Sequence, residues 1–390
     1  MSGAPVVVYH HRTAAEDGQA VHIRAMLRAF ADVGASVHEV GLVRRERVST
    51  PAAEARSGFG WIDRVPRFAR ELLEYGYTAV ARRRLVEAIR DHRPNFVYER
   101  YAFGNLGGVA ACKRTNTPLF LEVNSPLVDE LSRTRGLSFP RLARRVERHA
   151  FANADVVCVV TAVLGELLVD LGAPRERLLV TPNGVHPEQY VGSDPSAARA
   201  ALGLPNDDGA LWLGFVGYYR SWHRLELVVA ALARPALAHA HLVLVGEGPA
   251  RAELEEAARA AGVTERVHFC GPRRHDEIPR LLSAFDVGLV PAINPYASPL
   301  KLHEYMAAGL PTLAPDQPNL REVLVHERDA LLFPPGDGDA LAAAIERLAS
   351  DAALRTRLGA EARRQIEVQG LTWEHNARRV LERARTIGAL

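Results

Sequence analysis

The sequence lacks the residues and local patterns that several large classes of protein need. Its three cysteines, Cys112, Cys158 and Cys270, are far apart and form no CxxC pair, so neither a disulfide framework nor a zinc ribbon is expected. No run of about 18 apolar residues occurs, so no transmembrane helix is predicted. Residues 1–12 lack a basic start with a long apolar core and predict no signal peptide. The net charge of +2 gives no indication of nucleic-acid binding.

Motifs that bind dinucleotides, nucleoside triphosphates or catalytic zinc are also absent. The segment "VGEGPAR" (245–251) has Gly246 and Gly248 but Arg251 in the third glycine position, where an arginine prevents close approach of helix and strand. Neither GxxxxGKS/T nor HExxH occurs. The sequence therefore predicts no dehydrogenase cofactor and no metal site. It leaves the two glycines open between an ordinary tight turn and a ligand contact.

Lysine is the scarcest charged residue. All but two of the 48 basic residues are arginines, and the two lysines are Lys113 and Lys301. Lys301 lies in the stretch "SPLKLHEYMAAGLP" (298–311), three residues before Glu304. A lysine is a compact point charge whereas arginine is a planar fork. We therefore interpret Lys301 as occupying a place that a guanidinium would not fit.

Short apolar runs alternate with amphipathic helical stretches along the chain. Runs that are apolar on both faces are typical of parallel strands with right-handed helical crossovers. The runs lie at residues 5–10, 36–41, 95–100, 118–124, 154–160, 177–184, 211–217, 241–248, 266–271, 286–291, 310–315 and 330–337. Because 390 residues exceed one ordinary core, we expect an α/β fold with two doubly wound parallel sheets. The Gly- and Pro-rich segment 190–210 is predicted to link domains 1–190 and 191–370.

The segment 298–304 is predicted to begin a helix beside the second sheet, at the carboxyl ends of the strands, where such sheets bind ligands. Ser298 suits the N-cap and Pro299 the first turn. Lys301 in that turn opposes the helix dipole unless an anion is bound. Glu304 follows one turn later on the same face. The pair suits the phosphate and sugar hydroxyl of a nucleotide; a plain Lys–Glu pair within the helix is the alternative.

At this point the residues resemble a known family. "SPLKLHEYMAAGLPTLAPDQPNLREVLVHERDALLFPPGD" (298–337) resembles the donor-site signature of the retaining GT-B glycosyltransferases of family four, the group 1 type. Further segments resemble other elements of that family in the expected order, at 17–27, 180–190, 215–223, 242–254, 267–291 and 371–384. The resemblance implies two Rossmann-like domains facing a central cleft, with a crossover helix at 371–390 that returns to the first. It also implies a nucleoside-diphosphate sugar donor and retention of anomeric configuration.

The resemblance implies roles on the donor side. Glu304 bonds the ribose, and the amides of Leu300 and Lys301 hold the diphosphate, since Pro299 has no N–H. The donor-binding residues implied in this way are Gly18, Gly217, Tyr218, Gly246, Arg273, Tyr296, Ser298, Pro299, Leu300, Lys301 and Glu304. The implied catalytic groups are Lys301, Arg220, His223 and Glu304. They would stabilise the departing diphosphate electrostatically, with no metal or other cofactor.

Three positions depart from the family pattern. Tyr296 stands eight residues before Glu304, where many members have a second glutamate, so the donor sugar stays open. Tyr218 and His223 stand where members have arginine and lysine. Arg220 is a candidate replacement for the missing charge, and His223 would donate more strongly if protonated.

On the acceptor side, polar residues follow predicted strands of the first domain. The residues predicted to reach the acceptor are His10, His11, Arg100, Glu122 and Asn124. For His10, His11 and Arg12, the simpler alternative is that they are solvated residues at the end of a strand. For Glu122, the simpler alternative is that an Asn-Ser-Pro turn follows it. His22 is either a buried helix histidine or a donor contact.

The segment 132–151 contains six arginines interleaved with apolar residues. A basic amphipathic helix binds anionic membranes, although an arginine-rich solvated face is the simpler interpretation. We therefore expect a cytoplasmic protein with a possible peripheral membrane contact. The arginine and alanine bias suggests a bacterial source.

The function predicted from the sequence is sugar transfer to a glycan, lipid-linked or small-molecule acceptor, as in polysaccharide or glycoconjugate biosynthesis. One alternative is a GT-B nucleotide-sugar epimerase or hydrolase. The other is a degenerate, non-catalytic sugar-binding partner subunit. It is supported by the presence of Tyr218, His223 and Tyr296.

Overall fold

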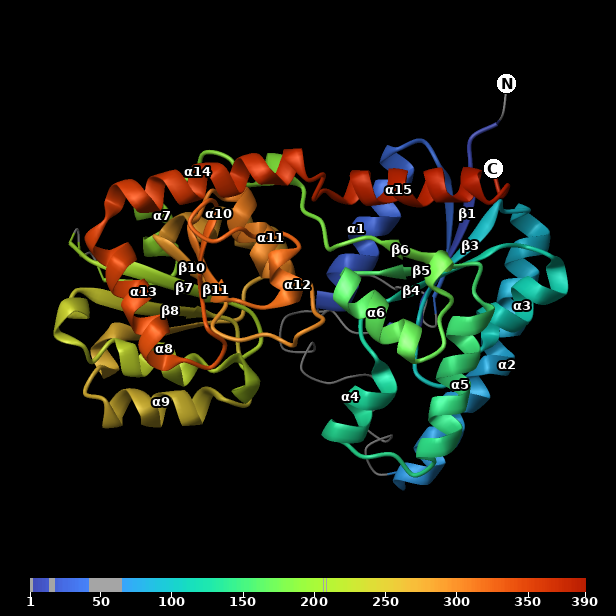
Figure 1. Ribbon diagram of the computed structural model, residues 1–390, viewed down its shortest axis with the longest axis horizontal. Helices are drawn as coiled ribbons and strands as arrows, with labels where there is room; N and C mark the ends of the chain where they lie inside the picture. Colours follow the sequence, from blue (N-terminus) through green and yellow to red (C-terminus); the bar gives the residue numbers. More distant parts are fainter. Residues whose placement is uncertain (1–2, 14–17, 42–64, 206, 208) are drawn as a thin grey trace. The chain divides into compact units, whose positions relative to one another are not determined.

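The computed structural model describes residues 3–13, 18–41, 65–205, 207 and 209–390. The chain divides into two compact units (Figure 1): unit 1 is Met1–Pro182 with Trp373–Leu390, and unit 2 is Asn183–Thr372. The predicted linker at 190–210 is wrong. That segment contains helix α7 (Pro195–Ala201), and its Ala198, together with Leu202, is buried in the core of unit 2.

The described part of unit 1 is a six-stranded parallel sheet of order β2-β1-β3-β4-β5-β6 with helices on its faces. The strands are β1 Val6–His10, β2 Ser36–Val40, β3 Phe96–Arg100, β4 Leu119–Val123, β5 Val156–Val159 and β6 Leu178–Val180. The helices are α1 Gly18–Asp32, α2 Arg67–His92, α3 Gly107–Thr115, α4 Leu127–Thr134, α5 Pro140–Asn153, α6 Ala162–Asp170 and α15 Trp373–Thr386. The C-terminal helix α15 packs on α1, as Figure 1 shows. Since β1 pairs with both β2 and β3, the direction of winding reverses between β1 and β3.

The described part of unit 2 is a second six-stranded parallel sheet, of order β12-β11-β10-β7-β8-β9. The strands are β7 Leu211–Val216, β8 Ala240–Val245, β9 Val267–Gly271, β10 Val287–Leu289, β11 Thr312–Pro315 and β12 Ala330–Phe333. Besides α7, the helices are α8 Leu225–Ala231, α9 Arg251–Ala260, α10 Ile278–Leu281, α11 Leu300–Ala307, α12 Pro318–Arg321, α13 Gly338–Ser350 and α14 Ala352–Val368. Here the winding reverses between β7 and β10.

Alternating side chains of each strand enter two different cores, because successive residues of a strand point to opposite faces. In β7, Leu213 and Phe215 belong to the core that contains residues of α8, α9 and α13, whereas Trp212 belongs to the core that contains residues of α10 and α11. A sheet covered on both faces requires strands that are apolar throughout. Eleven of the twelve predicted apolar runs contain a whole strand, and the run at 241–248 contains all of β8 except its first residue, Ala240, which confirms this part of the prediction.

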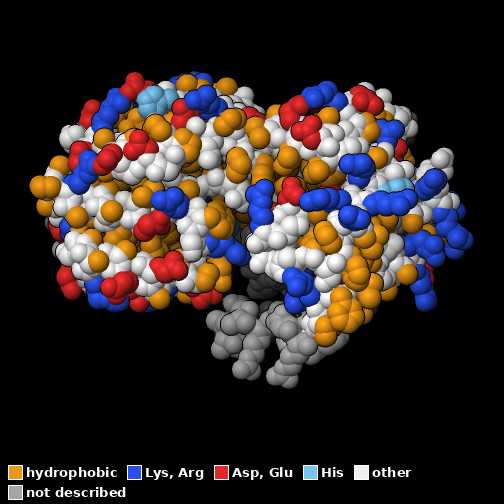
Figure 2. All heavy atoms as spheres, turned by 60° about the horizontal axis from the view of Figure 1, so that its bottom comes forward, with side chains coloured by type: hydrophobic (Ala, Val, Ile, Leu, Met, Phe, Trp, Pro, Cys, Tyr) orange, Lys and Arg blue, Asp and Glu red, His pale blue; other side chains and the backbone are white. Residues whose placement is uncertain are grey.

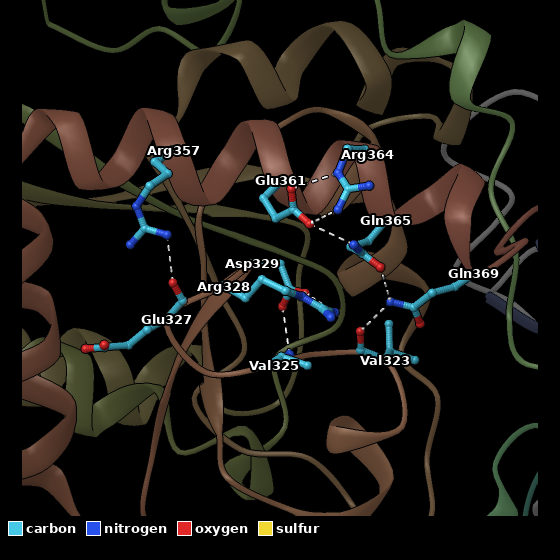
Figure 3. Close-up of polar contacts among 10 residues, drawn as sticks. All are labelled: Val323, Val325, Glu327, Arg328, Asp329, Arg357, Glu361, Arg364, Gln365 and Gln369. Atoms are coloured by element: carbon cyan, nitrogen blue, oxygen red, sulfur yellow. Dashed lines mark hydrogen bonds and ion pairs between the residues drawn. The ribbon is translucent and has the colours of Figure 1, made fainter.

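The second half of the 298–337 block has a structural role. Asp329 is fully buried, and its carboxylate accepts a hydrogen bond from the Val325 amide (2.8 Å). Gln369, the C-cap residue of α14, donates from its side chain to the Val323 carbonyl and to Gln365 Oε1, both at 3.0 Å (Figure 3). These bonds tie the turn at 323–329 to α14 of the same unit.

The segment 132–151 is helical but not one helix. Between α4 and α5, the buried Glu71 carboxylate accepts hydrogen bonds from the amides of Ser138 (2.5 Å) and Phe139 (3.0 Å). Helix α5 buries Phe151 and leaves Leu142 43% exposed. None of the helices within the described ranges combines the length and apolarity that crossing a bilayer demands.

Candidate active site

The switch point of unit 2 brings together residues that are distant in the sequence. Ligands of doubly wound sheets bind where the winding reverses, which here is beyond the ends of β7 and β10. Gly217 follows β7 directly, and a Cβ built on it would lie 3.1 Å from Lys301 Nζ. Lys301 is the second residue of α11, the helix that follows β10. The first turn of α11 therefore lies against the exit of β7.

Lys301 forms no close ion pair with any of the described residues. Its Nζ lies 3.6 Å from the centroid of the Phe215 ring. Among the described residues, no carboxylate oxygen lies within 4.0 Å of it, so the alternative of a Lys301–Glu304 ion pair within the helix is wrong. Burial lowers the pKa of Lys301 to about 7, although the charge of Glu304 opposes this shift.

Glu304 is the carboxylate of the same helix face, and it is 7% exposed. Burial raises the pKa of Glu304 to about 7, against the opposing effects of Lys301 and of hydrogen bonding by Tyr190. His275 Nδ1 lies 3.7 Å from one carboxylate oxygen. The site thus buries one acid and one base that are only partly compensated.

The loop after Gly217 contributes His223 and Arg220. Burial, followed by the charges of Lys301 and Arg220, lowers the pKa of His223 to about 2. The Arg220 amide donates to His223 Nδ1 (3.3 Å), so the proton of the neutral ring lies on Nε2. His223 is therefore neutral, so the stronger donation expected of a protonated ring does not apply here. Arg220 is exposed, and its guanidinium lies 5.0 Å from the centroid of the Tyr218 ring.

The start of α11 differs from the prediction. Pro299, not Ser298, occupies the N-cap position, and no side chain caps the helix. The amide of Leu302 donates to the Pro299 carbonyl (3.1 Å). The amides of Leu300 and Lys301 precede that bond and are oriented as the donors of a free helix N-terminus.

Two asparagines that the sequence analysis missed hold the loop before α11. The backbone amide of Asn183 donates to the Ser298 hydroxyl (3.2 Å), and its side-chain amide donates to the Ser298 carbonyl. The buried Asn319 donates to the carbonyls of Asn294 (3.2 Å) and Ala297 (2.7 Å). Asn183 belongs to "VTPNG" (180–184), where Pro-Asn-Gly was interpreted only as a family element. Nothing in the local sequence marks Asn319.

The glycines of this site are explained by close backbone packing. Gly246 has φ +133°, and a Cβ on it would lie 2.1 Å from the Gly217 carbonyl oxygen. A Cβ on Gly248 would lie 2.2 Å from the Tyr219 carbonyl oxygen. Close packing against residues 217–219 requires a glycine at both positions, and a ligand contact at Gly246 stays a prediction.

The remaining donor-side candidates are dispersed. Arg273 is exposed in the loop after β9, and Tyr218 is 51% exposed. Asn294 Nδ2 lies 3.5 Å from the Tyr296 hydroxyl. Gly18 begins α1 of unit 1. Among the residues with described positions, no three His, Cys, Asp or Glu side chains gather as metal ligands would.

Unit 1 has a cavity of about 370 Å³ at its own switch point, beyond β1 and β3. Of the five predicted acceptor residues, Arg100 and Asn124 line it. His11 lines another cavity, of about 240 Å³, and its Nε2 lies 2.8 Å from Glu39.

His10 and Glu122 do not face either cavity, which corrects their prediction as acceptor contacts. His10 is 1% exposed, and its Nδ1 lies 2.6 Å from Glu99 Oε1. Glu122 is also 1% exposed and accepts hydrogen bonds from Arg100 (2.5 Å) and Asn124 (2.9 Å). Both side chains hold neighbouring groups in place instead of reaching the surface.

Helix α1 supplies a further partner of Glu122. His22 Nε2 lies 2.8 Å from Glu122 Oε1. Burial alone would raise the pKa of Glu122, but His22, Arg100 and the hydrogen bonds of His22 and Asn124 hold it well below its ordinary value. The His22 ring packs edge-on against Trp373 of α15, with centroids 4.8 Å apart. The structure thus shows the buried helix histidine.

The comparisons with known proteins agree with this architecture. The family model "Glycosyltransferase Family 4" matches residues 17–189, and "Glycosyl transferases group 1" matches residues 210–351. The D-inositol 3-phosphate glycosyltransferase of Stackebrandtia nassauensis is 34% identical over 244 residues, which cover 59% of this chain and 54% of that protein. The chain thus matches about half the length of that relative.

Two solved structures show the same fold. Sucrose-phosphate synthase of Thermosynechococcus elongatus has a TM-score of 0.76 at 21% identity and covers 99% of each chain. Anabaena HepE, solved with UDP and glucose, has a TM-score of 0.72 at 17% identity and covers 99% of this chain and 100% of its own. The predicted fold class, with two doubly wound parallel sheets, is confirmed. The chain belongs to the group 1, family four glycosyltransferases and has their GT-B fold.

Proposed function

We propose that the protein is a retaining glycosyltransferase that moves a sugar from a nucleoside-diphosphate sugar to a glycan, lipid-linked or small-molecule acceptor. The observation that carries the proposal is Lys301, a partly buried ammonium beside helix amides at the switch point of unit 2, with no carboxylate oxygen within 4.0 Å among the described residues. An anion bound there would satisfy both the charge and the amides. The relatives add support, since one is a glycosyltransferase by name and HepE was solved with UDP and glucose.

Each donor-side residue has a proposed role. The diphosphate binds Lys301, Arg220 and the amides of Leu300 and Lys301, while Glu304 accepts from the ribose hydroxyls. The supporting residues are Gly18 and Gly217 beside the diphosphate, Tyr218 and Gly246 shaping the loop, Arg273 near the base, Tyr296 near the sugar, and Ser298 and Pro299 at the start of α11. A ribose hydroxyl would donate the hydrogen bonds that the buried Glu304 carboxylate lacks.

Retention fits a site that stabilises the leaving group. The bond from the anomeric carbon to the diphosphate oxygen breaks, the acceptor oxygen bonds to the same face, and its proton passes to the departing phosphate. His223 is neutral with its proton on Nε2, so it can donate to that phosphate. Because Lys301 and Arg220 supply positive charge, we propose that no metal is essential.

Both alternatives are less well supported. The degenerate-subunit hypothesis rested on Tyr218, His223 and Tyr296 replacing charged residues. Lys301 and Arg220 nevertheless leave two cations for an anion, and a binding site without turnover would have no need to desolvate Lys301. An epimerase or hydrolase would turn over the donor alone, so dependence of turnover on an added acceptor separates it from a transferase.

The direct test is thermal unfolding of the purified protein with UDP, GDP, TDP, ADP or NAD. A ligand at about 100 times its dissociation constant adds roughly 2.7 kcal/mol to the free energy of unfolding. We expect one nucleoside diphosphate to stabilise the wild type and to lose its effect in Glu304→Ala. No stabilisation by any of these at millimolar concentration would contradict the proposal.

Retention and metal independence are tested on the transfer reaction. Proton NMR of the first product formed should show the anomeric configuration of the donor, before any mutarotation. Activity should persist in EDTA. An inverted product would contradict the retaining mechanism, and full loss of activity in EDTA, restored by a divalent cation, would contradict metal independence.

We propose a cytoplasmic location with contact to the inner face of the membrane through unit 1. Near the start of α2, Phe68, Leu72 and Leu73 are 52%, 52% and 55% exposed. Arg141 and Arg145 are exposed on the neighbouring helix α5. Figure 2 shows hydrophobic and basic side chains side by side over this unit. Such a surface is complementary to an anionic bilayer.

Vesicle co-sedimentation tests this contact. We expect binding to vesicles with phosphatidylserine, weaker binding in 0.5 M salt because screening removes the charge attraction, and loss of binding in Phe68→Ser/Leu72→Ser. Equal recovery with neutral vesicles, or no binding to anionic vesicles at low salt, would contradict it.

A further inference from the structure

The cavity at the switch point of unit 1 has one polar and one apolar side. Its volume of about 370 Å³ lies in the lower part of the ~300–1,000 Å³ range of small-molecule pockets. It is bounded by residues that follow β1, β3 and β4 and by the side chains of α4. The residues that matter are Phe103, Leu127 and Leu131 on the apolar side and Arg12, Arg100 and Arg135 on the polar side.

Two of the three arginines are neutralised by the protein. Arg135 forms a two-point bond with Glu74, with N–O distances of 3.1 and 2.8 Å. Arg100 donates to the buried Glu122 at 2.5 Å. Arg12 differs, because no carboxylate among the described residues lies within 4.0 Å of it. Within the described part of the chain, Arg12 is therefore the one arginine of the lining without a carboxylate in direct contact.

Arg12 is held in place by uncharged groups. Its Nη1 donates weakly to the Phe103 carbonyl (3.4 Å), and its guanidinium lies 5.0 Å from the centroid of the Tyr77 ring. Burial lowers the pKa of Arg12, with the charge of Glu74 opposing the shift. A guanidinium that is partly desolvated and unpaired is suited to two-point binding of a carboxylate or phosphate.

Two further polar atoms of residues that line the cavity lack a hydrogen-bond partner among the described residues. The side-chain N–H of Asn124 donates to Glu122, while its Oδ1 is buried without a hydrogen-bond partner in the part of the chain that the structure describes. Arg135 Nε is likewise buried without a partner in that part of the chain. Both atoms are buried, so they belong to the wall behind the cavity and not to its accessible surface.

We infer that this cavity binds an acceptor that carries one anionic group, a phosphate monoester or a carboxylate, which is seated on Arg12. The inference rests on the proposed function, in which unit 1 receives the acceptor. It narrows the acceptor class: a neutral sugar leaves Arg12 unpaired, and an amino sugar is repelled by it.

The inference is tested by calorimetric titration of the full chain with four sugars that share one ring. They are glucose 6-phosphate, glucuronate, glucose and glucosamine. We expect at least one of the two anionic sugars to bind about tenfold or more tightly than glucose, because a charge-assisted two-point bond is added. Which of the two binds distinguishes phosphate from carboxylate. Equal binding of all four, or no binding of either anion, overturns the inference.

Substitutions assign the effect to Arg12. Arg12→Gln should remove the preference for the anionic sugar. Arg12→Lys, which keeps the charge, should retain part of it and guards against a folding defect in the first variant. The matched control is Arg90→Gln, which removes an exposed arginine of unit 1 outside the cavity. Full preference in Arg12→Gln, or its loss in Arg90→Gln, overturns the inference.

A nucleotide readout in the same samples separates this inference from the donor assignment. Stabilisation by the nucleoside diphosphate should be unchanged in Arg12→Gln, because no donor-binding role is given to Arg12. Anion binding without nucleotide binding would contradict the proposed function alone. Nucleotide binding without a preference for anionic sugars would contradict this inference alone.

Discussion

Glu122 of unit 1 and Glu304 of unit 2 are 1% and 7% exposed, yet their surroundings act on them in opposite directions. Arg100, His22 and Asn124 surround Glu122 and hold its pKa well below the ordinary value despite burial. Burial raises the pKa of Glu304 to about 7 because its neighbours compensate it only partly. Glu122 is compensated by charged and hydrogen-bonding neighbours of its own protein, whereas Glu304 has fewer hydrogen-bond donors around it.

The cations divide in the same way. Arg100 and Arg135 have carboxylate partners, whereas Lys301 and Arg12 have no carboxylate oxygen within 4.0 Å among the described residues. Each switch point therefore holds a cation without a carboxylate partner in the described part of the chain. A buried charge with its full set of partners has a structural role, and a buried charge without them indicates where a ligand supplies the rest.

The largest expected effect is that of Lys301→Met, which removes the unpaired cation and keeps an unbranched side chain. We expect transfer to slow at least ~100-fold, since a group that stabilises the leaving diphosphate is lost. The melting temperature should stay equal or rise, because a buried charge is removed. Steady-state rates and thermal melting measure the two quantities. A loss of stability that matches the loss of activity would show that Lys301 has a structural role. It would contradict the contrast drawn between Lys301 and the paired arginines of unit 1.

Glu122→Gln should act in the opposite way. Removing the charge leaves Arg100 buried without its counter-ion, which costs about 3 kcal/mol of unfolding free energy. Urea unfolding monitored by circular dichroism measures this loss. An unchanged midpoint would show that Glu122 is not held by the network described.

Glu304→Gln should stabilise the ligand-free protein above neutral pH. The pKa of Glu304 is raised from 4.5 to about 7 in the folded state. The folded protein therefore binds more protons than the unfolded one between these values, and this contribution to stability is lost as pH rises. The variant cannot ionise, so we expect it to be roughly 3 kcal/mol more stable than wild type at pH 8 and less than about 1 kcal/mol more stable at pH 5. Equal stability of the two proteins at pH 8 would contradict the raised pKa.

The smallest expected effects concern two glycines of unit 1. A Cβ on Gly108 would lie 1.9 Å from Glu99 Oε2, in the buried pair that Glu99 forms with His10. Gly108→Ala should cost about 2 kcal/mol, because this pair leaves no room to adjust. Gly76 lies in α2 with nothing within 4 Å of a Cβ, so Gly76→Ala should add about 0.5–1 kcal/mol. Thermal melting compares them, and a Gly108→Ala protein as stable as Gly76→Ala would show that the pair is loosely packed.

The strands and the donor helix could be predicted from the sequence because their signals are local. Apolar runs mark each strand. Lys301 stood out because it is one of only two lysines and lies three residues before Glu304. Ser298 was assigned to the wrong role because its actual partner, Asn183, is 115 residues away. Periodicity does not report such contacts.

The acceptor side was harder to predict for the same reason. Glu122 lies near the end of β4 and Arg12 follows β1. The sequence favoured Glu122 for function and a solvated position for Arg12. Which of them is neutralised depends on Arg100, His22 and Glu74, which are brought close only by folding. A local pattern predicts where a side chain emerges, but not whether it is already paired.

The most direct test of the account is the number of protons taken up when the nucleoside diphosphate binds. Lys301 is largely neutral in the free protein at pH 8 because its pKa is about 7, and a bound diphosphate should restore its charge. Calorimetric titration at pH 8 in buffers of different ionisation enthalpy should show an uptake of about 0.5–1 proton per site, absent in Lys301→Met. Binding with no proton uptake, or equal uptake in the two proteins, would contradict the claim that Lys301 is the unpaired cation awaiting the donor.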